Sequence, residues 1–213
     1  MIKIENVETW GFEHAIRGMR NPMNSWSKSD SDYDVYDNTK FIVGENDLDL
    51  MHRLFIGGTE HRKVMRMLHI SMDVTAPLYW WKEYDTYKVA TVANSCSTMH
   101  KIHAKPFELD DFSWDHMCEL SQGDLQRTIE TLNKCRLQFV TSKDKKYWWQ
   151  MIQLLPSSYN QKRTLDFNYE TAAGIIRQRT GHKLDEWHVF VDTLWDLPYM
   201  REIVEGMKTN DET

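Results

Sequence analysis

The chain has 213 residues, of which 41% are hydrophobic and 27% charged, and its net charge is −6 at pH 7. This composition is ordinary for a globular protein with a core, and it argues against a disordered, collagen-like or coiled-coil chain. The negative charge argues against a uniformly basic surface that holds a nucleic-acid polymer, although one local basic pocket would suffice for a nucleotide. Nine Trp and nine Tyr indicate a heavy aromatic core or, alternatively, a pocket for a flat ligand.

The first residues lack the apolar stretch of a signal peptide, and no apolar run is long enough to span a membrane. Three cysteines, Cys96, Cys118 and Cys135, are widely spaced and form no CxxC pair. This spacing indicates neither a disulfide framework nor a zinc ribbon. We therefore expect a cytoplasmic protein that is not bound to a membrane.

The first part of the chain predicts two short helices around a polar loop, within a single domain over residues 1–213. Residues 2–20 read as a strand that leads into a short helix. The Ser- and Asp-rich segment 21–40 predicts a mobile loop. A short helix follows at 47–56, where apolar residues recur at helical spacing.

The clearest strand covers residues 66–74, where apolar and polar residues alternate with period two over nine positions. One face predicts a core surface, and the other is mostly polar; the apolar face carries Leu68, Ile70, Met72 and Val74. Residues 75–77 then read as the start of a helix that runs to about residue 88, because Pro is tolerated in a first helical turn.

Helices fill most of the second half of the chain. Residues 89–97 are expected to be irregular, and 106–115 form an acidic loop. The tail at 208–213 is polar and expected to fray. The class is α+β and helix-dominated, with few strands, and the expected helices cover about 122–139, 144–155, 168–179 and 183–194.

No glycine-rich phosphate loop and no nucleophile elbow are present. The start of the last predicted helix is rich in acids and histidines, namely His182, Asp185, Glu186 and His188. These side chains could bind a metal, or the acids could simply stabilise the helix through its dipole. No metal ligand is therefore assigned. Basic residues cluster at Arg62, Lys63 and Arg66, among other places, and such clusters usually face solvent.

Arg177 and Arg179 are two residues apart and therefore leave opposite sides of the predicted helix. One is expected to face solvent, whereas the other could point inward, where a guanidinium needs an anion. A ligand phosphate is one candidate for that anion, and Glu186 or Asp166 is the structural alternative.

Several stretches in a fixed order carry a family resemblance. A strand that ends in Ala76-Pro77 precedes a helix, and an Asn and a Ser follow at Asn94 and Ser97. A Leu-Pro step is then followed after eleven residues by Asn168, and an Arg precedes a His-to-Trp stretch; these are Leu155-Pro156, Arg179 and 182–187. Taken together, these motifs resemble those of the flavin-dependent thymidylate synthases, the ThyX family, over about residues 66–195.

The resemblance implies a ThyX-like fold with a small antiparallel sheet and a homotetramer whose sites lie between subunits. It implies methylation of dUMP or a related pyrimidine nucleotide, with FAD, NADPH and methylenetetrahydrofolate. No protein nucleophile is needed in that family, so no catalytic residue is assigned. By position, Lys88, Asn168 and His182 would contact the flavin, and the nucleotide would be contacted by Glu83, Asn94, Ser97 and Arg179.

The chain also departs from the family pattern. Residues 86–88, Thr-Tyr-Lys, replace the family's Arg-His-Arg, so only Lys88 is basic there. Glu170 and Met99 each stand where the family has Arg, and Glu83 replaces a Gln. Because lost cations weaken phosphate binding, the departures predict a folded protein that retains FAD poorly. Other basic residues, such as Arg62, Arg66 or Lys162, could compensate.

Three functions from different classes follow from these observations. The first is a divergent thymidylate synthase-like flavoenzyme. The second is a catalytically impaired protein on the same scaffold that binds or sequesters a nucleotide. The third is an oligomeric structural protein. A shared fold does not decide among them.

Overall fold

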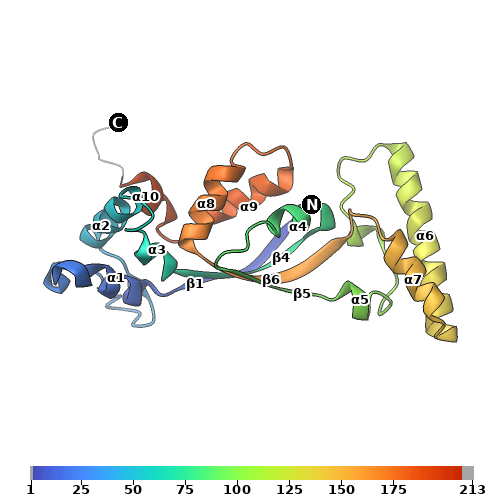
Figure 1. The fold of residues 1–213 in the computed structure, drawn as a ribbon, viewed down its shortest axis with the longest axis horizontal. Helices are drawn as coiled ribbons and strands as arrows, with labels where there is room; N and C mark the ends of the chain where they lie inside the picture. The colour runs from blue at the N-terminus through green and yellow to red at the C-terminus, as the bar shows by residue number, and fades with distance from the viewer. Residues whose placement is uncertain (1, 208–213) are drawn as a thin grey trace. The chain divides into compact units, whose positions relative to one another are not determined.

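The computed structural model describes residues 2–207, so the tail at 208–213 lies outside the described residues. The fold is α+β and mostly helical with a small antiparallel sheet, as the sequence predicted (Figure 1). The described chain divides into two compact units. Unit 1 comprises residues 2–5, 73–87 and 93–164, and unit 2 comprises 6–72, 88–92 and 165–207.

The main sheet has the strand order β1-β4-β6-β5. Its strands are β1 (Lys3–Trp10), β4 (His69–Pro77), β5 (Thr91–Ser95) and β6 (Asn160–Asn168). Hydrogen bonds at both ends of the β4–β6 pair show that these two strands are antiparallel. The amide of Tyr169 donates to the carbonyl of Leu68, and the amide of Leu78 donates to the carbonyl of Tyr159, both at 3.0 Å.

The predicted central strand is confirmed, and its alternation explains its burial. The four residues of its apolar face are at most 1% exposed: Leu68, Ile70, Met72 and Val74. The strand runs further than predicted, because the same alternation buries Ala76, and the adjacent Pro77, which ends the strand, is buried as well. The expected helix start at 75–77 is therefore wrong, and the helix, α4 (Leu78–Tyr84), begins one residue later and is shorter than expected.

Two further strands of the main sheet were not predicted. Residues 89–97 contain β5, which is almost fully exposed and so lacks the alternation that marks a half-buried strand. In β6 the buried positions include the polar Gln161, whose amide donates to the carbonyl of Cys96 at 2.8 Å. Only Leu165 and Phe167 supply an apolar period of two, which is too short a signal to identify a strand.

Unit 1 is built on a helix pair and an aromatic cluster. The helices α6 (Glu119–Ser142) and α7 (Lys145–Leu154) lie side by side (Figure 1), close to the predicted bounds. Helix α6 buries residues at helical spacing, namely Leu125, Ile129 and Leu132. The aromatic residues Trp80, Trp81 and Tyr84 of α4 are at most 2% exposed, so these rings belong to the core.

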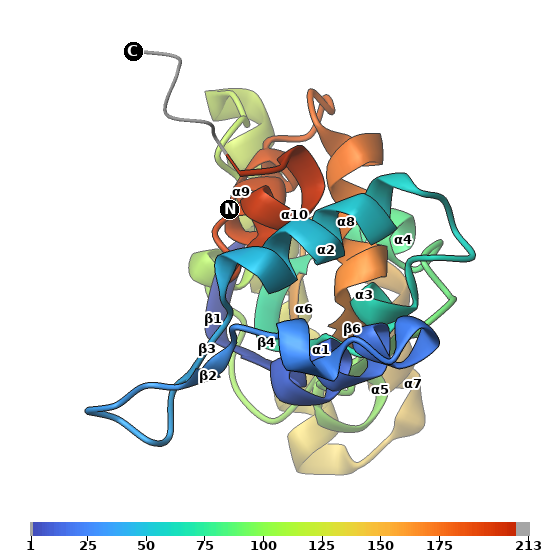
Figure 2. The ribbon, with the colours of Figure 1, turned by 90° about the vertical axis from the view of Figure 1, so that its left-hand side faces the viewer.

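Unit 1 also contains the short helix α5 (Thr98–Lys101), and the remaining α-helices of the described chain belong to unit 2. They are α1 (Phe12–Arg20), α2 (Glu45–Ile56), α3 (Lys63–Arg66), α8 (Tyr169–Arg179), α9 (Asp185–Trp195) and α10 (Met200–Glu205). The sequence predicted all of these except α3 and α10, which are short. Helices α2 and α10 pack against each other, as do α8 and α9 (Figure 2). Among residues 2–207, no helix combines the length and the apolar character needed to cross a bilayer.

A buried carboxylate anchors the segment 21–40, which forms two short 3₁₀ helices (Asn21–Met23 and Trp26–Lys28) and the strand β2 (Asp32–Tyr33). Asp47, in the first turn of α2, is fully buried. Its Oδ1 accepts from Nε of Arg20 at 2.8 Å, and its Oδ2 accepts from the hydroxyls of Ser29 at 2.6 Å and Ser31 at 2.7 Å. The middle of the predicted loop is thus fixed to two helices.

The polar network also controls the charge state of Asp47. Burial alone would raise the pKa of this carboxyl, but the hydrogen bonds from Ser29 and Ser31 and the nearby Arg20 outweigh burial and lower it. A lowered folded-state pKa means that the stabilisation is complete above the unfolded-state value of about 4. It is lost as the pH falls through the folded-state pKa.

We expect Asp47→Asn to lower the free energy of unfolding by about 3–5 kcal/mol, because the buried Arg20 loses its counter-charge. Urea denaturation at pH 7 measures this change. The control is Asp124→Asn, which removes the partner of the exposed Arg127 and should leave the unfolding midpoint unchanged. An Asp47→Asn protein with the wild-type midpoint would show that the buried pair does not anchor the loop.

Candidate functional site

A cavity of about 620 Å³ lies within unit 2, among helices α2, α8, α9 and α10. Its volume lies in the range of small-molecule sites. The walls are apolar, with four charged side chains at the edge. The apolar lining consists of Phe55, Ala173, Gly174, Ile176, Trp195 and Val204, and the charged residues are Arg62, Glu170, Arg177 and Glu205.

Helix α8 forms the floor of this cavity, which we call the α8 cavity. Glu170, Ala173, Gly174 and Arg177 recur at spacings of three and four, so they lie on one side of the helix. Ala173 and Gly174, in the middle of this face, have little or no side chain and so do not fill the cavity. A Cβ atom added at Gly174 would meet nothing within 4 Å, which means that the space above this residue is open.

Two arginines bring positive charge to the lining. The Nε of Arg62 donates to the carbonyl of Phe55 at 2.6 Å, and its guanidinium lies 4.5 Å from the centre of the Phe55 ring. These contacts hold the side chain in place, while its terminal nitrogens have no ion pair within residues 2–207. Arg177 is exposed and also lacks an ion pair among the described residues. Both guanidinium groups are therefore available to an anion.

The acid in the floor is neutralised. Arg66 forms a two-pronged ion pair with Glu170, with Nε 2.5 Å from Oε2 and a terminal nitrogen 3.2 Å from Oε1. That terminal nitrogen also donates to the carbonyl of Thr59 at 2.7 Å, so the loop after α2 is tied to α8. The hydrogen bond and charge of Glu170 raise the pKa of Arg66. With this pair neutral, the two free arginines outweigh the single remaining acid, Glu205.

Arg179 lies on another side of α8 from Arg177, as the spacing predicted. Its guanidinium lies 4.4 Å from the centre of the Trp187 ring, and a terminal nitrogen lies 3.1 Å from Nε2 of His182. The structure therefore brings together two of the predicted site residues, Arg179 and His182. Of the two arginines, it is Arg177 that lines the cavity.

The other predicted flavin residues occupy different positions in unit 2. Asn168 is buried and caps α8, because its Oδ1 accepts from the amide of Thr171 at 2.9 Å. This helix-cap role explains the position of an Asn at the strand end without a ligand. Lys88 is exposed and precedes β5, and its amine has no ion pair in the described part of the chain.

The remaining predicted nucleotide residues belong to unit 1. Glu83 lies in α4 and is partly buried. Asn94 is exposed in β5, and Ser97 caps the short helix α5 (Thr98–Lys101) by accepting from the amide of His100 at 3.1 Å. The structure thus distributes the seven predicted residues over both units, and it brings Arg179 and His182 into direct contact.

The His- and acid-rich start of α9 has interactions of its own. An Nε2 of His188 lies 2.6 Å from the carbonyl oxygen of His182, and its Nδ1 lies 3.7 Å from Asp185. The amide of Leu184 donates to Nδ1 of His182 at 3.2 Å. Within residues 2–207, no group of three or more His, Cys, Asp or Glu side chains is placed to hold a metal ion.

Sequence reasoning identified the parts of the cavity without assembling them. Arg62 and Arg66 stood out as a basic cluster that could compensate for the lost family arginines, and Arg177 as one of two alternatives. The signal that could have found the floor is the pair of small residues Ala173 and Gly174 between two charged positions on one helix face. Nothing in the sequence indicated that Arg66 would reach Glu170, which is 104 residues away.

Comparison with solved structures gives the same fold as the sequence resemblance. The chain is similar to two structures of thymidylate synthase X (ThyX) from Helicobacter pylori, both with FAD and dUMP. One has a TM-score of 0.67 and 15% identity, covering 95% of this chain and 96% of that one. The other has a TM-score of 0.67 and 16% identity, covering 97% and 100%.

No model of a known protein family matches the sequence, and no curated protein does. At these identities the structural likeness shows the fold alone. The predicted ThyX-like fold is therefore confirmed, and ligand and activity are matters for a proposal.

We predict that Asn168→Ala destabilises the protein by about 1 kcal/mol, because α8 loses its side-chain cap, whereas Asn168→Asp retains the cap. Thermal unfolding of the two variants at pH 7 distinguishes them. Equal melting temperatures for wild type and Asn168→Ala would mean that the cap does not contribute, and would leave ligand contact as the reason for this Asn.

Proposed function

We propose that this protein binds a nucleotide in the cavity of unit 2 and acts as a divergent flavin-dependent thymidylate synthase-like protein. The reaction would be methylation of dUMP or a related pyrimidine nucleotide with methylenetetrahydrofolate, FAD and NADPH. One observation supports this most strongly. The α8 cavity combines apolar walls with two unpaired arginines, in a fold whose solved neighbours contain FAD and dUMP.

The residues of the cavity suit a flavin nucleotide in kind. Such a group has flat rings, which pack on apolar and aromatic walls, and phosphates, which prefer arginine. Phe55 and Trp195 offer aromatic surface, and Arg62 and Arg177 offer the cations. The flavin, when bound, supplies the redox chemistry, and the protein supplies binding, orientation and electrostatics.

Each charged residue then has a defined task. Arg62, held by Phe55, presents a fixed guanidinium to a phosphate, and Arg177 supplies a second, more exposed cation. Arg66 removes the repulsion that Glu170 would otherwise exert on an anion. This compensation offsets part of the weak FAD retention that the lost family arginines predict.

The family-derived roles remain part of the proposal. Arg179 and His182, which contact each other, would bind the pyrimidine nucleotide and the flavin respectively. Lys88 and Asn168 would add flavin contacts, and the nucleotide would also be contacted by Glu83, Asn94 and Ser97. The proposed assembly is a cytoplasmic homotetramer that completes the site.

The alternative is a catalytically impaired protein that binds or sequesters a nucleotide on the same scaffold. The Thr-Tyr-Lys sequence at 86–88, with an exposed Lys88, favours this alternative because the family's arginine pair is missing there. A dUMP-dependent tritium-release assay with added FAD, NADPH and methylenetetrahydrofolate decides between the two. Formation of dTMP supports the enzyme, and nucleotide binding without turnover supports the alternative.

Arg177→Ala should weaken binding of FAD by about tenfold, the scale of one lost charge-assisted contact at a partly exposed site. Flavin fluorescence quenching measures the affinity. Arg127→Ala is the matched control, since it removes an exposed helical arginine outside the cavity. If Arg177→Ala binds FAD as tightly as the control while Arg179→Ala does not, the phosphate site belongs to Arg179.

Arg66→Ala tests the compensation separately. We expect it to weaken FAD binding because Glu170 then faces the cavity as an unpaired anion. The double variant Arg66→Ala/Glu170→Gln should recover most of the lost affinity, since the repelling charge is gone. Failure of the double variant to recover would indicate that Arg66 contributes by ordering the loop near Thr59 and not by neutralising charge.

A further inference from the structure

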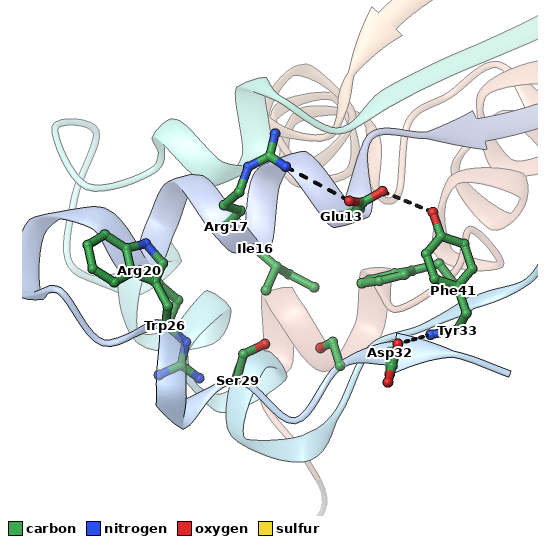
Figure 3. Close-up of a pocket in the computed structure, with 10 residues that line it drawn as sticks. Glu13, Ile16, Arg17, Arg20, Trp26, Ser29, Asp32, Tyr33 and Phe41 are labelled. Atoms are coloured by element: carbon green, nitrogen blue, oxygen red, sulfur yellow. Dashed lines mark hydrogen bonds and ion pairs between the residues drawn. The ribbon is translucent and has the colours of Figure 1, made fainter. Parts of the chain in front are cut away.

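Two further cavities of unit 2 adjoin each other, and aromatic side chains contribute to the walls of both. A cavity of about 530 Å³ lies between the start of α1, the ribbon of β2 and β3 (Phe41–Ile42), and the turn before α10. A smaller one of about 270 Å³ adjoins it (Figure 3). The two share Glu13, Tyr33 and Phe41, and we call them together the α1 cleft. No residue of the nucleotide cavity lines it.

Aromatic rings form the walls of the larger part of the α1 cleft. Tyr33 and Phe41 meet edge to face at 5.2 Å with an angle of 79° between their planes. Phe12 and Tyr199 form a second pair at 5.5 Å and 73°. Trp10 also lines the cavity and is 44% exposed. Ring faces attract cations, so walls built from aromatic residues suit a positively charged group.

A carboxylate lies where the two parts of the cleft meet. Oε2 of Glu13 accepts a hydrogen bond from the hydroxyl of Tyr33 at 2.9 Å (Figure 3). Within residues 2–207, the carboxylate also forms an ion pair with Arg17, whose terminal nitrogen lies 3.9 Å from Oε1. Such an exposed pair one helical turn apart is weak. Tyr33 therefore holds the carboxylate in position, and the exposed Arg17 compensates its charge only weakly.

Other charged side chains also line the cleft, and one of them, Arg20 in the smaller part, is paired with the buried Asp47. Asp32 lines the smaller part and adds negative charge. Lys40 lines the larger part, but its charge also acts on Asp37, whose pKa is lowered chiefly by hydrogen bonds from Thr39 and further by Lys40. His14 also lines the larger part.

We infer that the α1 cleft binds an organic cation, specifically a quaternary ammonium group that carries an organic tail. Such a group cannot donate a hydrogen bond, so it is recognised by ring faces and by one nearby carboxylate. The five rings and Glu13 provide both. The cleft is larger than a bare tetramethylammonium ion requires, which is why the ligand has a tail. This site is separate from the proposed nucleotide site and does not depend on it.

Isothermal titration with choline and with its neutral isostere 3,3-dimethyl-1-butanol tests the inference. The two probes have the same shape, so charge alone separates them. For the wild-type protein we expect choline to bind about tenfold more tightly, given the strength of cation–π and carboxylate contacts. Equal binding of both probes, or no binding of either at millimolar concentration, would overturn the inference.

Two substitutions with opposite expected effects on choline affinity test whether the site lies at Glu13. Glu13→Gln should reduce choline affinity to that of the isostere. Arg17→Gln removes the competing cation and should increase choline affinity by a few fold, without disturbing the buried core, because Arg17 is exposed. The matched control is Arg53→Gln, which removes the same kind of pair, with Asp49 on α2, and should change nothing. An unchanged or reduced affinity in Arg17→Gln would contradict the placement at Glu13.

Discussion

The charge of the α8 cavity depends on one ion pair, Arg66 with Glu170. Without Arg66, the floor of the cavity would present a carboxylate to any phosphate, and the two remaining arginines would face two acids. With it, the cavity keeps a positive excess. The same arginine holds the loop after α2 through the Thr59 carbonyl, so the wall and the charge of the cavity are set by a single side chain.

The two proposed sites of unit 2 lie on different helices and differ in the side chains that line them. The α8 cavity joins apolar walls to free guanidinium groups, whereas the α1 cleft joins aromatic walls to a fixed carboxylate. A buried pair, Arg20 with Asp47, connects the two regions, because it ties α1 and the loop that precedes β2 to α2. Loss of that pair is expected to loosen the ribbon that walls the cleft as well as to destabilise the unit.

Sequence patterns predicted those parts of the fold in which burial is periodic. The strand through Ile70 and Met72 and the helices α6 to α9 follow this rule. Strand β6 was not predicted because the polar Gln161 occupies a buried position, where its side chain donates a hydrogen bond to a carbonyl 65 residues away. The α8 cavity was not predicted for a similar reason. Spacing separated Arg177 from Arg179 but could not tell which of them faces open space, and the pairing of Glu170 joins residues distant in the chain.

The position of a bound nucleotide in crystals grown with FAD and dUMP tests the central claim most directly. We predict phosphate oxygens within hydrogen-bonding distance of the guanidinium of Arg62 or Arg177, above the floor that Ala173 and Gly174 form on α8. Density for the nucleotide only at other places, with the α8 cavity holding nothing but solvent, would contradict the assignment of this cavity as the nucleotide site.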